Sequence, residues 1–96
     1  MKIVEVTENK KKYLDLLLLA DEQEDMIDRY LDTGKMYVLD DNGVKCECVI
    51  TDEGNNILEI QNIATVPEYQ GKGYARALIE FIINNYREQY LSLIHI

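Results

Sequence analysis

The sequence predicts a mixed α/β (α+β) domain in which helices pack on a mixed β-sheet. Three observations support this class. Residues 2–6 alternate between apolar and polar side chains, as a half-buried strand does. Residues 36–66 contain three strand-like segments separated by turn sequences, and from residue 74 the apolar side chains recur at intervals of three and four. The 96 residues provide for one domain with a small core.

The segment after the first strand predicts two helices. Thr7 is expected to cap a helix that starts near Glu8. Asp21 is followed three residues later by Glu24, which is the spacing of a capping box for a second helix. We expect Gly34 to end that helix in the left-handed conformation.

Residues 36–39, 44–51 and 57–66 predict a meander of antiparallel strands. The first two are joined by residues 40–43, whose Asn-Gly pair suits the positive φ angles of a type I′ turn. The third is expected to stop at Pro67, which cannot donate to a strand ladder. In the middle strand the alternation favours one apolar face, with Val44, Cys46, Cys48 and Ile50, and one mostly polar face, with Lys45, Glu47 and Thr51.

A helix from Tyr74 and a strand from Tyr90 complete the predicted element order, which is β-α-α-β-β-β-α-β. The helix places one broad apolar face toward the sheet, because Tyr74, Ala77, Leu78 and Phe81 fall on the same side.

Composition excludes several classes of function. Eighteen acidic and ten basic residues give a formal net charge of −8, which argues against nucleic acid as a partner and favours a cationic or amine substrate. The longest apolar run is too short to span a bilayer, so we expect no membrane partner. Cys46 and Cys48 are expected to be two small buried side chains, without a metal site and in the reducing cytoplasm.

The informative stretch is the glycine-containing loop between the third meander strand and the last helix. The first turn of a helix carries backbone N–H groups without partners, and its dipole adds positive potential. Gly71 and Gly73 let an anion approach that backbone, and Lys72 and Arg76 add positive charge. The spacing does not match a P-loop or a dinucleotide-binding fingerprint.

The stretch from Asn62 to Ala75, with Gln70-x-x-Gly73-x-Ala75 at its end, closely resembles the acetyl-CoA-binding motif of the GNAT (GCN5-related) N-acetyltransferases. The resemblance implies a GNAT-like mixed sheet and direct transfer of acetyl from acetyl-CoA, as co-substrate, to a primary amine in a ternary complex. The acceptor would be a small molecule or a peptide. Tyr13 and Tyr30, on the two early helices, would flank it.

By the same resemblance, cofactor binding is assigned to two backbone segments. The loop and helix start would hold the pyrophosphate, through Gln70, Gly71, Lys72, Gly73, Tyr74 and Ala75. The end of the preceding strand would pair with the pantetheine arm, through Ile63, Ala64, Thr65 and Val66. The N–H near Ile63 or Ala64 would polarise the thioester carbonyl.

Glu59 is the candidate catalytic base, since some members of the family use a glutamate on this strand to take the proton of the amine. The alternative is an exposed strand carboxylate without a role. Glu68 is nearer the motif, but we expect it to be solvated in the loop.

The resemblance covers the N-terminal portion of the family's domain, so residues 1–96 are expected to form a single incomplete GNAT domain, truncated before the C-terminal helix and strands. An open edge at the last strand would then favour a homodimer. Acetyl transfer is expected to be impaired, and the alternative is a catalytically inactive fragment that binds coenzyme A or another protein.

Overall fold

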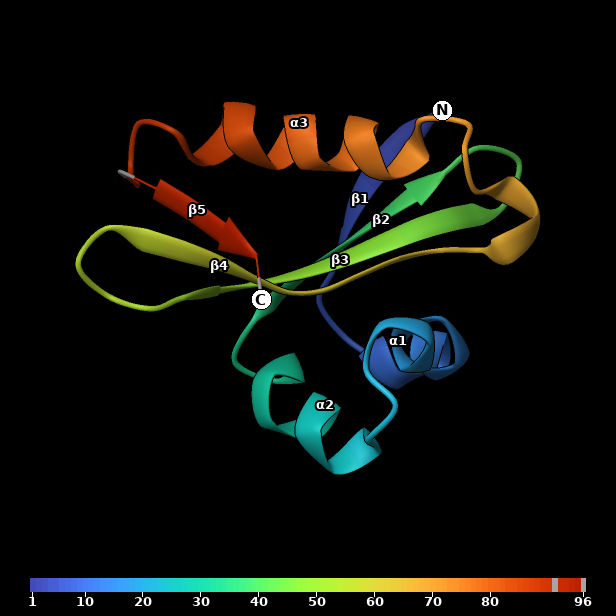
Figure 1. Ribbon diagram of the computed structural model, residues 1–96, viewed down its shortest axis with the longest axis horizontal. Helices are drawn as coiled ribbons and strands as arrows, with labels where there is room; N and C mark the ends of the chain where they lie inside the picture. Colours follow the sequence, from blue (N-terminus) through green and yellow to red (C-terminus); the bar gives the residue numbers. More distant parts are fainter. Residues whose placement is uncertain (91, 96) are drawn as a thin grey trace.

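The computed structural model describes residues 1–90 and 92–95 as a five-stranded sheet between two helical layers (Figure 1). The strands lie in sequence order: β1 (Lys2–Val6), β2 (Lys35–Asp40), β3 (Val44–Asp52), β4 (Ile57–Thr65) and β5 (Ser92–His95). Neighbours are antiparallel except for β4 and β5, which are parallel. The predicted order of elements is confirmed. Leu91 and Ile96, at the last expected strand, lie outside the described residues.

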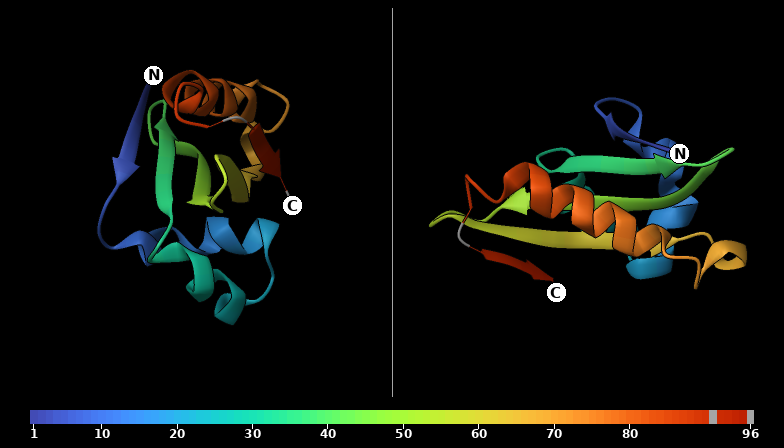
Figure 2. Two further views of the ribbon diagram at one scale, coloured as in Figure 1. Left: turned by 90° about the vertical axis from the view of Figure 1, so that its left-hand side faces the viewer. Right: turned by 90° about the horizontal axis from the view of Figure 1, so that it is seen from above.

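Helices cover both faces of the sheet. The helices α1 (Leu14–Ala20) and α2 (Glu24–Leu31) pack on one face, and α3 (Tyr74–Tyr86) crosses the other (Figures 1 and 2). Short 3-10 turns, Lys10–Tyr13 and Pro67–Tyr69, precede α1 and follow β4. The crossover through α3 joins β4 to β5, as a parallel pair requires.

Each face of the sheet carries its own apolar core. The core under α3 contains the side chains of Leu39, Cys46, Cys48, Ile50, Leu78 and Ile82. The core under α1 and α2 contains those of Leu17, Ile27, Leu31, Met36, Val38 and Val49. Both cysteines are fully buried and carry free thiols, which confirms that they serve as small apolar side chains.

The face assignment of β3 was partly wrong. A bulge at Lys45 shifts the register, since Leu39 pairs with Cys46 while Asp40 pairs with Val44. Val44 therefore packs against the α1 and α2 core instead of the α3 core. The face expected to be mostly polar is also covered, because α1 and α2 lie on it, and Glu47 is fully buried there.

The starts of the two early helices also differ from the prediction. Asn9 adopts the left-handed conformation (φ 54°, ψ 40°), which asparagine tolerates, so the chain makes a 3-10 turn before α1 and Thr7 caps no helix. The N-cap of α2 is Gln23. Asp21 lies two residues earlier, where its Oδ1 accepts the N–H of Gln23 at 3.2 Å and closes a turn.

Gly34 is required for close packing and not for a left-handed angle. It is not among the glycines with positive φ. A Cβ there would lie 2.7 Å from the carbonyl oxygen of Tyr30 and 2.9 Å from that of Ile50. Lys10 stabilises the same connection between α2 and β2, since its Nζ donates to the carbonyl oxygens of Leu31 at 2.7 Å and Gly34 at 2.8 Å.

Glu47 is an ionisable group that the apolar surroundings hold in its neutral form. Glu47 is fully buried, and neither oxygen of its carboxyl group has a hydrogen-bond partner among the described residues. Burial raises the pKa of Glu47 from about 4.5 to about 8. Between these values the folded protein holds one more proton than the unfolded chain, so stability falls as pH rises.

Replacing Glu47 with glutamine should remove this dependence. We predict that the Glu47→Gln variant gains stability over the parent between pH 5 and pH 8, by at least about 1 kcal/mol, in urea unfolding followed by circular dichroism. Glu5→Gln, at an exposed position of β1, is the control and should leave the pH dependence unchanged. Parallel stability curves for the parent and Glu47→Gln would show that Glu47 is not a buried neutral acid.

Candidate functional site

A cavity of about 370 Å³ lies where β4 ends and α3 begins. Eight of the ten predicted cofactor-binding residues line it: Ile63, Ala64, Thr65, Gln70, Gly71, Gly73, Tyr74 and Ala75. Val66 and Lys72 do not line it. The structure therefore brings the strand end and the loop together in one place.

The loop presents backbone N–H groups to this cavity. Gly71 and Gly73 have positive φ angles of 78° and 86°, and no atom lies within 4 Å of a Cβ built on either. Gly73 is the N-cap of α3, and no side chain caps this helix. The first helical N–H to find a backbone acceptor is that of Ala77, which donates to Gly73 at 3.0 Å. The N–H groups of residues 74–76 are therefore available to an anion.

Among the described residues, no second strand pairs with the end of β4 beside the cavity. The pairing with β5 covers Ile57 to Ile60 and ends there within the described residues. The following residues of β4, including Ile63 to Thr65, pair only with β3. Unpaired N–H and C=O groups along such an edge can take an extended ligand as an additional strand.

A bulge in β4 changes which side chains share a face. Asn62 pairs with Val49, but the next pair is Ile60 with Ile50, so Gln61 is an extra residue. In a regular strand, Glu59 and Ala64 would point to opposite faces, because they are five residues apart. With the extra residue, both point toward α1 and α2.

Glu59 is buried, so it is not the exposed strand carboxylate that the alternative interpretation described. Glu59 is 6 % exposed, and it pairs with Thr51 on the neighbouring strand β3. Desolvation, followed by the charge of Glu53, raises the pKa of the Glu59 carboxyl above its usual value. Glu68 is exposed in the 3-10 turn after β4, as expected.

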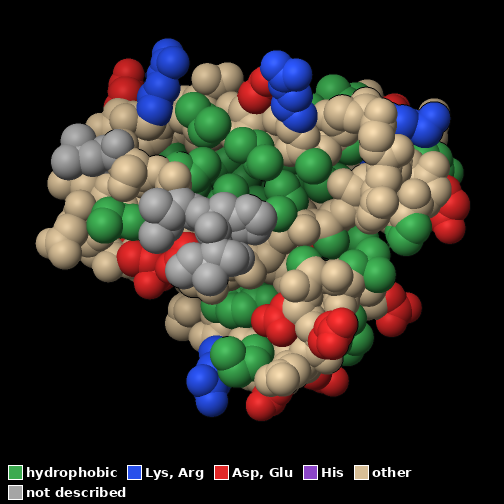
Figure 3. Space-filling model, in the orientation of Figure 1, with side chains coloured by type: hydrophobic (Ala, Val, Ile, Leu, Met, Phe, Trp, Pro, Cys, Tyr) green, Lys and Arg blue, Asp and Glu red, His purple; other side chains and the backbone are tan. Residues whose placement is uncertain are grey.

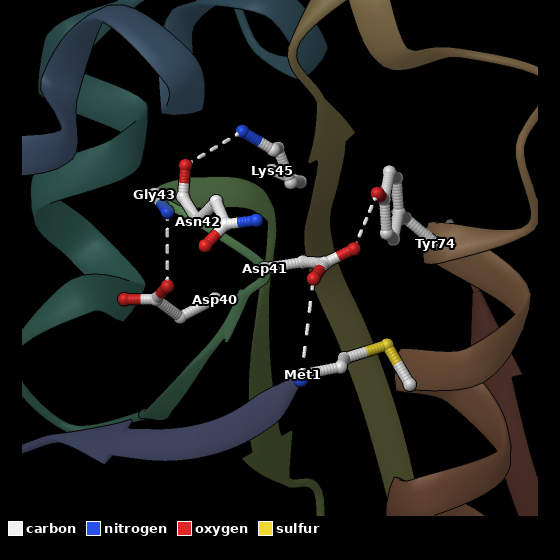
Figure 4. A network of polar contacts seen from close by, with 7 residues as sticks. All are labelled: Met1, Asp40, Asp41, Asn42, Gly43, Lys45 and Tyr74. Carbon is white, nitrogen blue, oxygen red and sulfur yellow. Dashed lines mark hydrogen bonds and ion pairs between the residues drawn. The ribbon is translucent and has the colours of Figure 1, made fainter.

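One hydrogen bond ties the start of α3 to the β2–β3 turn (Figure 4). Tyr74 donates its hydroxyl proton to Asp41 Oδ2 at 2.7 Å, and the Met1 amino group lies 4.0 Å from Asp41 Oδ1. Lys45 donates to the carbonyl oxygen of Asn42 at 3.0 Å. The bond between Tyr74 and Asp41 holds the first residue of α3, and with it the available amides, against the sheet.

The same contacts continue to the wall of the cavity. The Nζ atom of Lys45 lies 4.1 Å from the centre of the Tyr69 ring, in cation–π geometry. Tyr69 in turn meets the ring of Tyr74 edge to face. Both tyrosines line the cavity, whereas Lys45 does not. Lys45 therefore orients the ring of Tyr69 from outside the cavity.

A second cavity, of about 600 Å³, opens on the face covered by α1 and α2. Its lining comes from the α1–α2 connection, from α2, from the end of β3 with the following turn, and from Gln61 of the bulge. Ala20 lines both cavities, so they adjoin at the end of α1. Tyr30 lines the second cavity, whereas Tyr13 packs against the apolar core under α1 and α2.

Several lining residues were not predicted from the sequence. Leu19, Ala20 and Tyr69 line the first cavity, and Asp52 and Glu53 line the second. For Leu19 and Ala20 the sequence offers no signal, since only packing brings α1 beside β4. Tyr69 lies inside the motif and could have been named as part of it.

Comparisons with known proteins agree with the geometry. The family model of the acetyltransferase (GNAT) domain matches residues 32–96. The chain therefore belongs to the GNAT acetyltransferase family. No curated protein sequence matches the chain significantly.

Solved structures of acetyltransferases share the fold. A GNAT family acetyltransferase from Elizabethkingia anophelis, with acetyl-CoA bound, has a TM-score of 0.88 and 30 % identity, over 97 % of this chain and 63 % of that one. A Bacillus subtilis acetyltransferase in complex with CoA has a TM-score of 0.81 and 30 % identity, over 91 % and 58 %. An IAA acetyltransferase from Bacillus cereus has a TM-score of 0.78 and 31 % identity, over 91 % and 59 %. The chain thus spans about three fifths of their length.

Helices of membrane-spanning length and apolarity are absent from the described part of the chain.

Acetyl-CoA binding should depend on Gly73. We predict that Gly73→Val raises the dissociation constant of coenzyme A at least about tenfold in calorimetric titration, because the added side chain stands between an anion and the amides. Gly54→Val is the matched control: Gly54 also has a positive φ (80°) and no atom within 4 Å of a built Cβ, but it lies in the β3–β4 turn. Equal affinities for the two variants would contradict the site.

Proposed function

We propose that the protein transfers acetyl from acetyl-CoA to a primary amine. The observation that carries this proposal is the first cavity, where available amides at the start of α3 adjoin the open edge of β4. Two of the similar structures, one with acetyl-CoA bound and one in complex with CoA, support it.

The residues of the first cavity fit the two parts of such a co-substrate. The amides after Gly73 suit the diphosphate, and Arg76 at the cavity adds a positive charge. The open edge at Ile63 to Thr65 suits the pantetheine arm, whose amides can hydrogen-bond as a strand does. An N–H of that edge would polarise the thioester carbonyl.

The reaction removes two protons from the attacking nitrogen. The ammonium gives the first to a base; the neutral amine then attacks the acetyl thioester, a C–N bond forms as the C–S bond breaks, and the second proton passes from the nitrogen through water to the thiolate leaving group. The amine must lose its proton first, because an ammonium has no lone pair. We assign this step to the carboxylate of Glu59, acting through water. The bulge turns Glu59 to the same face as Ala64, and desolvation raises the affinity of its carboxylate for a proton.

A second candidate is coenzyme binding without transfer. It is favoured by the position of Glu59, which does not line the first cavity. A thiol-release assay separates the two candidates, because binding alone releases no thiol.

Removing the base should lower the rate without changing coenzyme binding. We predict that Glu59→Gln lowers kcat for acetyl transfer roughly 100-fold while the KM for acetyl-CoA stays within about twofold, measured by thiol release. The rate of the parent should rise with pH through an ionisation above the usual range of glutamate, because the pKa of Glu59 is raised and only its ionised form accepts a proton. This rise should be absent from Glu59→Gln.

Glu68→Gln is the control, since Glu68 is an exposed carboxyl close to the motif. It should retain both the rate and the pH profile of the parent. Thiol release by Glu59→Gln at the parental rate would remove Glu59 from the mechanism, and no thiol release by the parent, with coenzyme bound, would favour the second candidate.

A further inference from the structure

Three polar atoms are buried on the sheet face under α1 and α2 without a hydrogen-bond partner among the described residues. They are both carboxyl oxygens of Glu47 and the Oδ1 atom of Asn62. The two residues are 0 % and 1 % exposed. The acidic side chains of α1 and α2 are exposed instead, and Figure 3 shows acidic side chains on that part of the surface. Since buried polar groups in proteins almost always have a partner, the three atoms indicate a bound group.

The strand register makes Glu47 and Asn62 neighbours. Glu47 pairs with Ala64, and two residues further along β3 Val49 pairs with Asn62. Glu47 and Asn62 are therefore diagonal neighbours, with roughly 7–8 Å between their Cα atoms, a spacing that long side chains can span. Val49 belongs to the apolar core under α1 and α2, so all four side chains point toward these helices. The three atoms thus face one small region.

One water molecule would satisfy all three atoms. Burial raises the pKa of Glu47 to about 8, so at neutral pH its carboxyl group has one O–H donor and one carbonyl acceptor, while Asn62 Oδ1 only accepts. A water accepts the bond from the O–H group and donates one bond to each acceptor. This gives it the three hydrogen bonds that are typical of a buried water. A direct bond between the two side chains would satisfy only two of the three atoms.

The neighbouring residue Ala64 provides space and a path for a water. It lies beside Glu47 on the same face, and its side chain is a single methyl group. It also lines the first cavity, so a water can enter past it from that cavity. A metal ion fits less well, because the described part of the chain gathers no group of three or more His, Cys, Asp or Glu side chains.

The amide nitrogen of Asn62 holds both early helices. Its Nδ2 donates to the carbonyl oxygen of Leu17, in α1, at 2.9 Å and to the hydroxyl of Tyr30, in α2, at 3.0 Å. Tyr30 in turn donates to Asp21 Oδ2 at 3.2 Å. Asn62 therefore anchors the end of α1 and its connection to α2, where Ala20 lines both cavities.

We propose that Glu47 and Asn62 bind one water molecule under α1, and that this water orients the Asn62 amide toward both helices. Glu47 and Asn62 are positioning residues in this role, since they act on the cavities through the helices that Asn62 holds. The inference goes beyond the proposed function, because it holds whether or not the chain transfers acetyl.

The experiment is water-selective NMR spectroscopy of the isotope-labelled full chain, as the parent and as two variants of similar side-chain length. Glu47→Gln keeps a donor and an acceptor at this position, whereas Glu47→Met keeps neither. We expect cross-peaks between water and the side-chain amide protons of Asn62 in the parent and in Glu47→Gln, and none in Glu47→Met. The same amide protons should exchange with solvent at least about tenfold faster in Glu47→Met than in Glu47→Gln. Circular dichroism of each variant verifies the fold.

Two controls exclude other sources of the signal. Glu47→Gln has no acid proton that exchanges with solvent, so its cross-peaks cannot come from the carboxyl group. Tyr30→Phe, added to Glu47→Gln, removes the hydroxyl proton next to Asn62 Nδ2, and the cross-peaks should remain. A crystal structure of Glu47→Gln should show electron density for a water within hydrogen-bond distance of Asn62 Oδ1 and of the substituted side chain.

Three results would overturn the inference. They are cross-peaks that persist in Glu47→Met, cross-peaks that disappear with Tyr30→Phe, and a direct hydrogen bond between the side chains at positions 47 and 62 with no water between them. None of these bears on coenzyme binding or thiol release, which test the proposed function separately.

Discussion

Within the residues that the structure describes, strand β4 has a neighbouring strand on both sides only along its first half, and the site depends on this constraint. Its early residues lie between β3 and β5, whereas Ile63 to Thr65 pair with β3 alone. Backbone polar groups need partners, so an edge that ends inside the molecule beside a cavity suits an extended ligand. The strand then runs through Pro67 into the loop that starts α3, which places the available amides next to the open edge.

The bulge at Gln61 gives the same strand a second property. One extra residue turns Glu59 and Ala64 to the same face, and Gln61 itself lines the second cavity. The first cavity carries the helix start and Arg76, and the second carries Asp21, Asp52 and Glu53 together with Arg29.

The sequence predicted most of the fold because the signals are local. Alternation defines the strands, the Asn-Gly pair of the β2–β3 turn adopts the two positive φ angles that were expected, and the glycines of the loop mark the helix start. The bulge at Gln61 was missed although the pattern changes there: apolar side chains lie at 58 and 60 and then at 63, with Gln61 and Asn62 between them. The burial of Glu47 and Glu59 was missed for another reason: whether a polar strand face is solvated depends on what packs over it, here α1 and α2. The second cavity combines the α1–α2 connection with the β3–β4 turn, and no motif connects these segments.

The central claim is that the open edge of β4 and the start of α3 together bind coenzyme A. The most direct measurement is a titration of the isotope-labelled protein with coenzyme A, followed by the amide resonances in NMR spectra. The account predicts that the largest shifts fall on residues 63–65 and 71–76, with those of β1 and α2 little changed. Saturable shifts confined to other segments, or none at millimolar coenzyme A, would contradict it.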